Sequence, residues 1–378
     1  MKTVKGKPSG RFAPVIGIAA RERRPFYARA GHIFVGETSG VHTLGYAGCV
    51  LSGPGGGLWQ PDTVACADID RIHEGDILRL TADGTAAVVW EAGSAQNAFL
   101  LTEACNCRCL MCPQPPKPHD PRTLAEAHAI LTLLRGRNQE AMCITGGEPT
   151  LPGDGFIAFL GRCAAEHPEA EICVLTNGKT FADREFTRRV AAVASPKATF
   201  CVSLHGDVPA LHDAVTGAAG SFAATEDGIY NLALHGLRIE IRHVVTRLNY
   251  RRLPQFALHL AAYFPFCSHY ALMGMELCGC AATNMAEIGI APHEYREELA
   301  RAVLTLHRRG LPVSVYNVPL CLCDARARPF ARQSISSWKN IYLPPCTSCS
   351  RQSACAGFFS TSSPLPLEHI QPFTEVTA

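Results

Sequence analysis

The sequence lacks an excess of charge of either sign and lacks long apolar runs. It has 35 Lys and Arg against 33 Asp and Glu, a formal net charge of +2, which argues against a strongly basic nucleic-acid binder. Charged residues make up 18% of the chain, below the usual figure of about 25%. No apolar run approaches the roughly 20 residues that span a bilayer. The apolar stretch 13–20 is too short for a signal-peptide core, so we expect a cytoplasmic protein without membrane contact.

Cysteine, by contrast, is abundant, with 18 residues. In a secreted protein they would form disulfides. In a cytoplasmic protein they bind metal or stay reduced as small core residues. Five stand singly in apolar, strand-like runs and are expected to fill the core: Cys143, Cys163, Cys173, Cys201 and Cys267. The other cysteines stand close together in the sequence, and these groups are the candidate metal ligands.

The length of 378 residues indicates two or three domains. We expect residues 1–96 to hold a basic tail over 1–25 and then a small β-rich domain. Its signals are short apolar runs broken by glycine and a hairpin turn at Asp83-Gly84, between runs 77–81 and 86–90.

Residues 97–318 alternate strand-like and helix-like runs, about six β–α pairs in order. This alternation predicts an α/β fold with a parallel sheet and helices outside it, a partial (β/α)6 barrel of the TIM type. The expected strands are 98–101, 141–144, 171–175, 199–204, 238–245 and 269–273. Sites on such sheets gather where the strands end, so the residues after each strand are the candidates.

Three cysteines follow the first expected strand with the spacing C-x3-C-x2-C: Cys105, Cys109 and Cys112. A tight loop can turn three thiolates toward one centre, and thiolates are the ligands of iron–sulfur clusters. Three ligands leave one iron of a four-iron cluster open, as a reactive centre needs. The alternative is a structural zinc site with Cys107 as fourth ligand.

This spacing after a first barrel strand resembles the radical SAM superfamily. The resemblance implies a 4Fe–4S cluster on Cys105, Cys109 and Cys112. The open iron would bind S-adenosylmethionine, whose reductive cleavage yields a 5′-deoxyadenosyl radical. After the second strand, Gly146-Gly147-Glu148 looks like the family's GGE element, which hydrogen-bonds the methionine amine. Bare backbone at the two glycines allows close approach of a ligand.

Three further positions are candidate cofactor contacts by the same resemblance. Asn177 follows the third strand, although Asn before Gly is first of all a turn signal. Ser203 ends the fourth strand and fits a contact to the ribose or carboxylate. Arg242 lies in the fifth strand and either points into the barrel toward the cofactor carboxylate or points outward.

Residues 319–378 lose regular periodicity and hold a second cysteine group. Their spacing resembles the auxiliary-cluster extensions of radical SAM peptide maturases, although Phe359 stands where a further cysteine is usual. The resemblance implies one auxiliary cluster on Cys321, Cys346, Cys349 and Cys355, with Cys323 as a substitute for Cys321. A structural zinc ribbon with the same ligands is the alternative. Either metal explains how a short irregular tail stays folded.

The stretches 105–117 and 329–344 resemble the maturases of the His-Xaa-Ser system, HxsC type. Such maturases are implied to modify a ribosomally made precursor with His-Xaa-Ser repeats. Their implied partners are a second radical SAM maturase and an electron donor. Two alternatives stay open: a radical SAM enzyme for a small metabolite, a protein side chain or RNA, and a non-enzymatic, zinc-stapled binding protein. The sequence does not define the bond formed.

Overall fold

A computed structural model describes residues 2–37, 43–53, 61–333, 340–361 and 369–374. The chain divides into two compact units. The first comprises residues 1–99, 121–142 and 165–169, and the second comprises residues 100–120, 143–164 and 170–378. Within the described ranges, no helix is long and apolar enough to cross a membrane.

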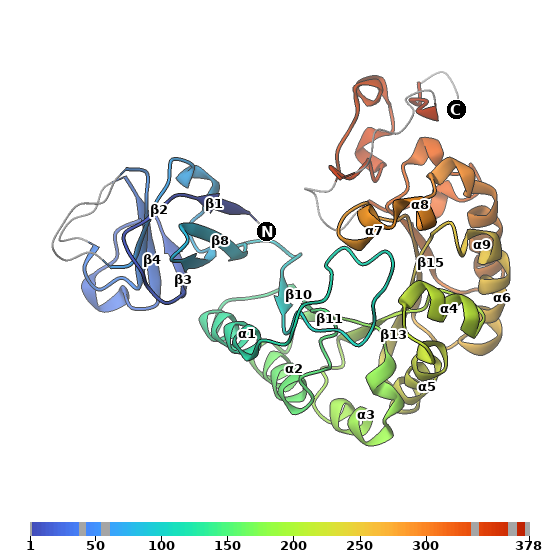
Figure 1. Ribbon diagram of the computed structural model, residues 1–378, viewed down its shortest axis with the longest axis horizontal. Coiled ribbons are helices and arrows are strands. Elements are labelled where there is room, and N and C mark those ends of the chain that lie inside the picture. Colours follow the sequence, from blue (N-terminus) through green and yellow to red (C-terminus); the bar gives the residue numbers. More distant parts are fainter. Residues whose placement is uncertain (1, 38–42, 54–60, 334–339, 362–368, 375–378) are drawn as a thin grey trace. The chain divides into compact units, whose positions relative to one another are not determined.

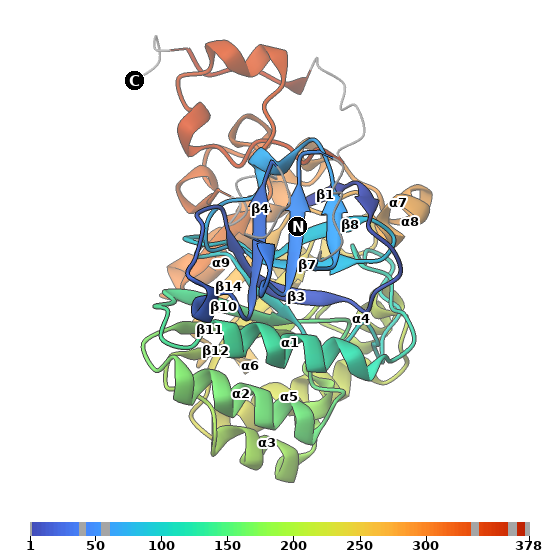
Figure 2. The same ribbon diagram turned by 90° about the vertical axis from the view of Figure 1, so that its left-hand side faces the viewer.

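The first unit is built on an eight-stranded sheet in the order β1-β8-β7-β3-β4-β5-β6-β2 (Figure 2). Its strands are β1 Thr3–Lys5, β2 Lys7–Pro8, β3 Val15–Ala20, β4 His32–Gly36, β5 Gly48–Leu51, β6 Thr63–Ala65, β7 Ile77–Thr81 and β8 Thr85–Trp90. The expected hairpin is confirmed, since β7 pairs antiparallel with β8 and Gly84 takes a φ of 80° at the turn. Helix α1 (Pro121–Leu133) belongs to this unit, and its Glu126 pairs with Arg79 of β7 at 3.0 Å.

The expectation of a loose tail over residues 1–25 is wrong. Strand β1 pairs with β8 and β2 pairs with β6, so the two ends of the sheet are consecutive parts of one N-terminal segment. Gly6 joins them, and a side chain there would come within 2.1 Å of the Ala65 carbonyl oxygen. The close approach of Gly6 to Ala65 therefore leaves no room for a larger residue between the two edge strands.

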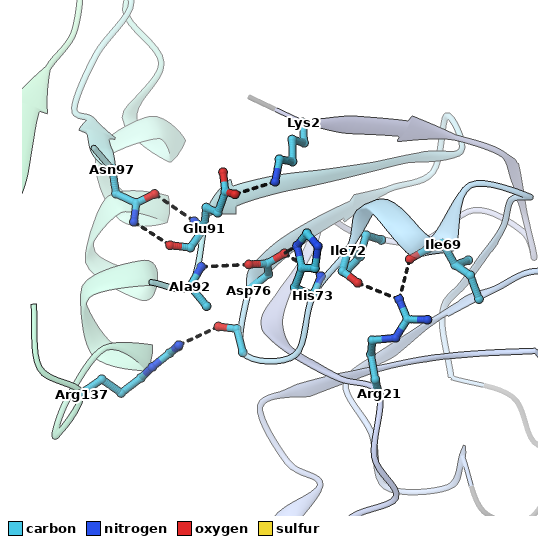
Figure 3. A network of polar contacts seen from close by, with 11 residues as sticks. Lys2, Arg21, Ile69, Ile72, His73, Asp76, Glu91, Ala92, Asn97 and Arg137 are labelled. Carbon is cyan, nitrogen blue, oxygen red and sulfur yellow. Dashed lines mark hydrogen bonds and ion pairs between the residues drawn. The ribbon is translucent and has the colours of Figure 1, made fainter. Parts of the chain in front are cut away.

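A buried carboxylate holds the inner loops of this unit together (Figure 3). Asp76 is fully buried and accepts hydrogen bonds from the backbone N–H groups of His73 and Ala92, both at 2.8 Å. Next to it, Arg137 donates to the Gly75 carbonyl oxygen at 2.7 Å. The Asp76 carboxylate thus connects the loop before β7 to the segment after β8. Burying this group without hydrogen-bond partners would be costly.

The core of the second unit is a seven-stranded sheet in the order β15-β14-β13-β12-β11-β10-β9. Its strands are β9 Ala98–Leu100, β10 Ala141–Thr145, β11 Glu171–Thr176, β12 Ala198–Ser203, β13 Arg238–Val244, β14 His269–Met273 and β15 Val313–Tyr316. Neighbours from β11 to β15 are parallel. The order is open-ended among the described residues, which is the geometry of a partial barrel. The predicted α/β class is confirmed, and the sheet has a seventh strand, β15, that the sequence analysis did not predict.

Helices follow the strands and lie on the convex side of the curved sheet (Figure 1). They are α2 Asp154–Glu166, α3 Arg184–Ala191, α4 Pro209–Thr216, α5 Ser221–Leu234, α6 Leu253–Tyr263 and α9 Arg296–Arg308. Two short helices, α7 (Cys280–Thr283) and α8 (Met285–Ile288), come after β14. Because the connected strands run parallel, all their carboxyl ends meet at one edge, where the candidate site lies.

The segment after β15 has little regular structure. Its described parts contain single turns at Leu320–Leu322, Arg328–Phe330, Pro344–Ser348 and Gln352–Ala354. It returns to the barrel, because Ala331 forms a parallel bridge with Val315 of β15. A small apolar group of Leu322, Phe358 and Ile370 packs with Cys321 and Cys346.

Candidate functional site

The loop of residues 101–120 carries the first three candidate cysteines. An ion pair between Lys117 and Glu103 at 2.7 Å closes the loop at its base. Its middle is anchored to the end of α4, since the Arg108 and Leu110 N–H groups donate to the carbonyl oxygens of Thr216 and Val215, both at 2.9 Å. The tight approach requires glycine at the helix end, because a side chain on Gly217 would lie 2.5 Å from the Arg108 carbonyl oxygen.

Cys105, Cys109 and Cys112 are half-buried free thiols in this loop, whereas Cys107 is buried to 3% exposure. Burial raises the pKa of Cys112, so its thiolate needs a partner charge such as a metal. Within the described ranges, no three His, Cys, Asp or Glu side chains are grouped as a metal site. The donor set nevertheless fits an iron–sulfur cluster, because three free thiols share one anchored loop.

Gly146 and Gly147 pack against the start of the cysteine loop. A side chain on Gly146 would lie 2.6 Å from the Thr102 carbonyl oxygen, and one on Gly147 would lie 2.3 Å from that of Ala104. The Gly147 N–H donates to the Thr102 carbonyl oxygen at 2.8 Å. The chain's own backbone therefore already requires these glycines. Their contact with a cofactor stays a prediction.

Glu148 is fully buried, and four donors surround its carboxylate. Oε1 accepts from the Thr150 N–H at 3.1 Å and from the hydroxyls of Thr150 and Thr176 at 2.7 and 2.8 Å. Oε2 accepts from the Asn177 N–H at 2.7 Å. Burial raises the pKa of Glu148, and the four hydrogen bonds counteract that rise. A carboxylate oxygen has about two acceptor sites, and Oε2 accepts from one donor only, so Oε2 keeps room for one further donor.

Asn177 links this carboxylate to the cysteine loop. Its backbone N–H binds Glu148, and its side-chain amide donates to the Asn106 side chain at 2.7 Å. The same amide nitrogen lies 3.5 Å from the sulfur of Cys107 and 4.0 Å from that of Cys105. The structure thus brings the predicted GGE and Asn177 positions together with the first cysteines at one edge of the sheet.

Ser203 and Arg242 lie opposite each other on neighbouring strands. Arg242 reaches Cys173 on β11 at 3.8 Å, two strands away. The next residue, His243, contacts Phe256 of α6 on the helix side of the sheet, so Arg242 points to the opposite, concave side. Of the two predicted orientations, the inward one is therefore observed. The guanidinium is already paired, however, because its Nε donates to Glu240 at 2.5 Å. No contact to a cofactor group is needed to explain its place.

A polar network inside the barrel was not predicted from the sequence. Glu240 binds His269 at 2.7 Å, and His269 also contacts the Ser314 hydroxyl at 3.0 Å. Burial opposes ionisation of Glu240, but hydrogen bonds from His269 and Arg242 and the charge of Arg242 lower its pKa to about 2. The sequence contains one signal for this network: Glu240 and Arg242 are two residues apart in one strand, so their side chains lie on the same face of the sheet.

Cysteine thiols lie beside this network. The sulfurs of Cys173 and Cys201 are 3.1 Å apart. Hydrogen bonds from the thiols of Cys143 and Cys201 lower the pKa of Cys173. These three residues were expected to be plain core fillers, but they form a polar contact group on three neighbouring strands.

The second cysteine group converges on a cavity of about 20 Å³ in the C-terminal segment. All four predicted ligands line it: Cys321, Cys346, Cys349 and Cys355. Cys323 does not line it and is buried to 2% exposure. The N–H groups of Leu320 and Gly357 point at the Cys355 sulfur at 3.3 and 3.4 Å, as hydrogen bonds to cluster sulfurs do.

The fold and this site define an α/β barrel with a thiol loop at the carboxyl edge of its strands. Residues 99–260 match the family model of the Radical SAM superfamily. The chain therefore contains a radical SAM domain over these residues. This domain implies a 4Fe–4S cluster and S-adenosylmethionine as cofactors.

Relatives and solved structures are similar over parts of the chain. Fe-coproporphyrin III synthase of Methanosarcina barkeri is 24% identical, over 64% of this chain and 57% of its own length. Mycofactocin maturase MftC of Mycobacterium ulcerans is 33% identical, over 46% and 44%. The chain thus spans about half the length of these relatives. The solved structure of anSMEcpe with bound AdoMet has a TM-score of 0.46 and 16% identity, covering 58% of this chain and 63% of that chain.

Proposed function

We propose that the chain is a peptide maturase that cleaves S-adenosylmethionine reductively and modifies a ribosomally made precursor with His-Xaa-Ser repeats. The anchored loop of Cys105, Cys109 and Cys112 beside Glu148 and Asn177 is the observation that carries the radical chemistry. The similarity to a mycofactocin maturase supports a peptide substrate. The resemblance of residues 105–117 and 329–344 to HxsC-type maturases supports the repeat, although residues 334–339 lie outside the described residues.

Cys105, Cys109 and Cys112 hold the 4Fe–4S cluster in this proposal. When bound, the cluster and S-adenosylmethionine would supply radical chemistry for hydrogen abstraction from the substrate. Glu148 keeps one acceptor position on Oε2 for the amine of the methionine group. Asn177 is hydrogen-bonded both to the Glu148 carboxylate and to Asn106 of the cysteine loop. Glu148 and the cysteine loop therefore cannot move independently of each other.

Gly146 and Gly147 shape the backbone that carries Glu148, because only glycine tolerates the approach of residues 102–104. Ser203 faces the same edge from the end of β12 and is proposed to bind the ribose or carboxylate. Arg242, opposite Ser203 on the neighbouring strand, is proposed as a positioning residue. Its Nε is held by Glu240, and in this proposal the remaining N–H groups of the guanidinium would donate to a carboxylate of the cofactor.

Cys321, Cys346, Cys349 and Cys355 are proposed to hold a second cluster, with structural zinc as the alternative for this site. Their convergence on one cavity favours Cys321 over Cys323 as the fourth ligand. A second radical SAM maturase and an electron donor are the proposed partners.

The test is an anaerobic purification followed by turnover with reductant, S-adenosylmethionine and a His-Xaa-Ser peptide. A brown protein with broad absorbance at about 400 nm supports a cluster. Colourless protein with stoichiometric zinc would establish the zinc-stapled alternative instead. Formation of 5′-deoxyadenosine with a changed peptide mass supports the maturase. Deoxyadenosine with unchanged peptide would leave the radical SAM enzyme and remove the repeat substrate.

A further inference from the structure

A lysine follows the end of β11, next to the cysteine loop. A single 3-10 turn, Lys179–Ala182, begins three residues after the strand ends at Thr176. The Lys179 N–H donates to the Asn177 side-chain oxygen at 3.0 Å. The carbonyl oxygen of Asn177 accepts from the Thr225 hydroxyl of α5 at 2.9 Å. The backbone that carries the Lys179 side chain is therefore fixed against the barrel.

The ammonium group of Lys179 lies against residues 105–107 of the cysteine loop. Its Nζ donates to the Asn106 carbonyl oxygen at 3.1 Å and lies 3.8 Å from the Cys107 sulfur. The Cys107 N–H in turn donates to the Cys105 sulfur at 3.4 Å. Because Asn106 is bonded directly to Cys105, a positive charge is held one residue away from a proposed cluster ligand.

The surroundings of this ammonium group limit how far water screens its charge. Lys179 is half-buried, and the Cys107 side chain that it contacts is buried to 3% exposure. Charges that interact through protein are screened less than charges that interact through water. The charge of Lys179 also lowers the pKa of His212, a buried residue of α4. Its electrostatic effect therefore extends to other groups at this edge of the sheet.

Negative groups gather at the same edge once a cluster is bound. They are the three thiolates of Cys105, Cys109 and Cys112 and the buried carboxylate of Glu148. One-electron reduction by the proposed electron donor adds one further negative charge to the cluster. Net charge and hydrogen bonds to the sulfurs set the potentials of such clusters. A fixed cation beside a ligand therefore stabilises the reduced state more than the oxidised state.

We propose that Lys179 raises the reduction potential of the cluster on Cys105, Cys109 and Cys112, so that the electron needed to cleave S-adenosylmethionine enters more readily. This inference rests on the proposed function for the presence of that cluster. Lys179 acts through its charge on the cysteine loop and is a positioning residue. The alternative role is structural, in which its hydrogen bond to the Asn106 carbonyl oxygen only fastens the loop.

The experiment is an anaerobic redox titration of the full chain with its clusters, followed by the electron paramagnetic resonance of the reduced state. The part of the signal that changes when S-adenosylmethionine is added reports the first cluster, which separates it from a second one. Lys179→Met removes the charge and keeps an unbranched side chain. We expect the equilibrium constant for reduction to fall about tenfold, which is a fall of about 59 mV in a one-electron midpoint potential.

Two further variants separate the charge from the hydrogen bond. Lys179→Gln keeps a donor without the charge and should shift the potential as Lys179→Met does. Lys179→Arg keeps the charge and should retain the wild-type potential. Lys197→Met is the matched control, because Lys197 is also half-buried but precedes β12, at the opposite end of the strand from the cysteine loop. Its variant should keep the wild-type potential, with iron per chain measured throughout.

Equal midpoint potentials in wild type, Lys179→Met and Lys179→Gln, at equal iron content, would overturn this inference. So would the same shift in Lys179→Arg, or loss of iron from both uncharged variants, because Lys179 would then only fasten the loop. The proposed function fails in a different way. A wild type without a cluster that responds to S-adenosylmethionine would overturn the proposed function and this inference with it, whereas a cluster whose potential ignores Lys179 would overturn the inference alone.

Discussion

We predict that three histidines buried close together make the stability of the second unit depend on pH. The rings of His205 and His212 are 6.0 Å apart, and those of His205 and His243 are also 6.0 Å apart. Burial lowers the pKa of His212 and of His243 to about 4, and it lowers that of His205 as well. The ordinary value is about 6.5. The fold therefore stabilises the neutral imidazoles.

Nearby charges are too few to reverse this effect. Asp213 raises the pKa of His212 while Lys179 lowers it, and both act less than burial. The Leu204 carbonyl oxygen at 3.0 Å and Asp207 raise the pKa of His243, but its ring centroid lies only 4.3 Å from that of Phe256 in α6. Burial in apolar surroundings is therefore the dominant cause.

The sign and size of this pH effect on stability follow from the difference in bound protons between the folded and unfolded states. A base with a lowered folded pKa binds fewer protons folded than unfolded, so its contribution to stability is present above pH 6.5 and is lost as pH falls toward 4. Between pH 7 and pH 5 a shift from about 6.5 to about 4 removes about 2 kcal/mol of unfolding free energy for each such histidine. We expect His243→Asn to lose less stability over this interval, by about 2 kcal/mol. An asparagine amide can still donate to the Leu204 carbonyl oxygen but does not titrate.

The assay is urea unfolding at pH 7 and pH 5, followed by tryptophan fluorescence, on wild type, His243→Asn and His235→Asn. His235 is exposed, so its variant should show the wild-type pH dependence. Comparing variants cancels any acid sensitivity that a bound cluster adds to all of them. If His243→Asn and wild type lose equal stability between the two pH values, the buried neutral histidine is not a source of acid sensitivity and the reasoning fails.

The remaining predictions concern the cysteine sites. Cys109→Ala should abolish 5′-deoxyadenosine formation and lower iron per chain, and continued turnover would contradict its role as a ligand. Cys349→Ala should lose only the second complement of iron, whereas Cys323→Ala, buried outside the ligand cavity, should keep both; equal iron in the two variants would count against the ligand set. Gly147→Ala places a methyl group 2.3 Å from a carbonyl oxygen of the cysteine loop and should cost about 2–4 kcal/mol through strain and lost hydrogen bonds. Urea midpoints check this against Gly10→Ala, where an added methyl meets nothing within 4 Å.

Features set by local sequence were predicted well. The barrel strands from β9 to β14 are short apolar runs, and the cysteine loop is a spacing that needs no distant partner to be seen. Strand β15 has only four residues, one of them Ser314, so its apolar signal is weak. Strand β1 was missed for a different reason: it is stabilised by pairing with the distant strand β8, for example Thr3 with Ala87. The local sequence contains no signal for strand pairing between residues so far apart in the chain.

The candidate site likewise has features that the sequence predicted and features that it did not. The places of Glu148 and Asn177 follow from where their strands end, because parallel strands end at one edge. Their hydrogen bonds to each other do not follow from the sequence, since they depend on the register of neighbouring strands. Arg242 shows the limit most clearly. Its partner Glu240 lies two residues away on the same strand and so on the same face, but its contact with Cys173 depends on the order and register of three strands, which no local pattern encodes.

Backbone context separates the candidate metal ligands from the other cysteines, whereas the pKa does not. Burial raises the pKa of Cys49 and Cys267 to about 12, and it also raises the pKa of the proposed ligands Cys112 and Cys355. Cys173 is the exception among the strand cysteines, because two thiols and Arg242 stabilise its thiolate. It nevertheless sits in a strand whose side-chain direction is fixed by the ladder. The ligands proposed here stand in loops and single turns, where the backbone can still turn each sulfur toward a shared centre when the cluster binds.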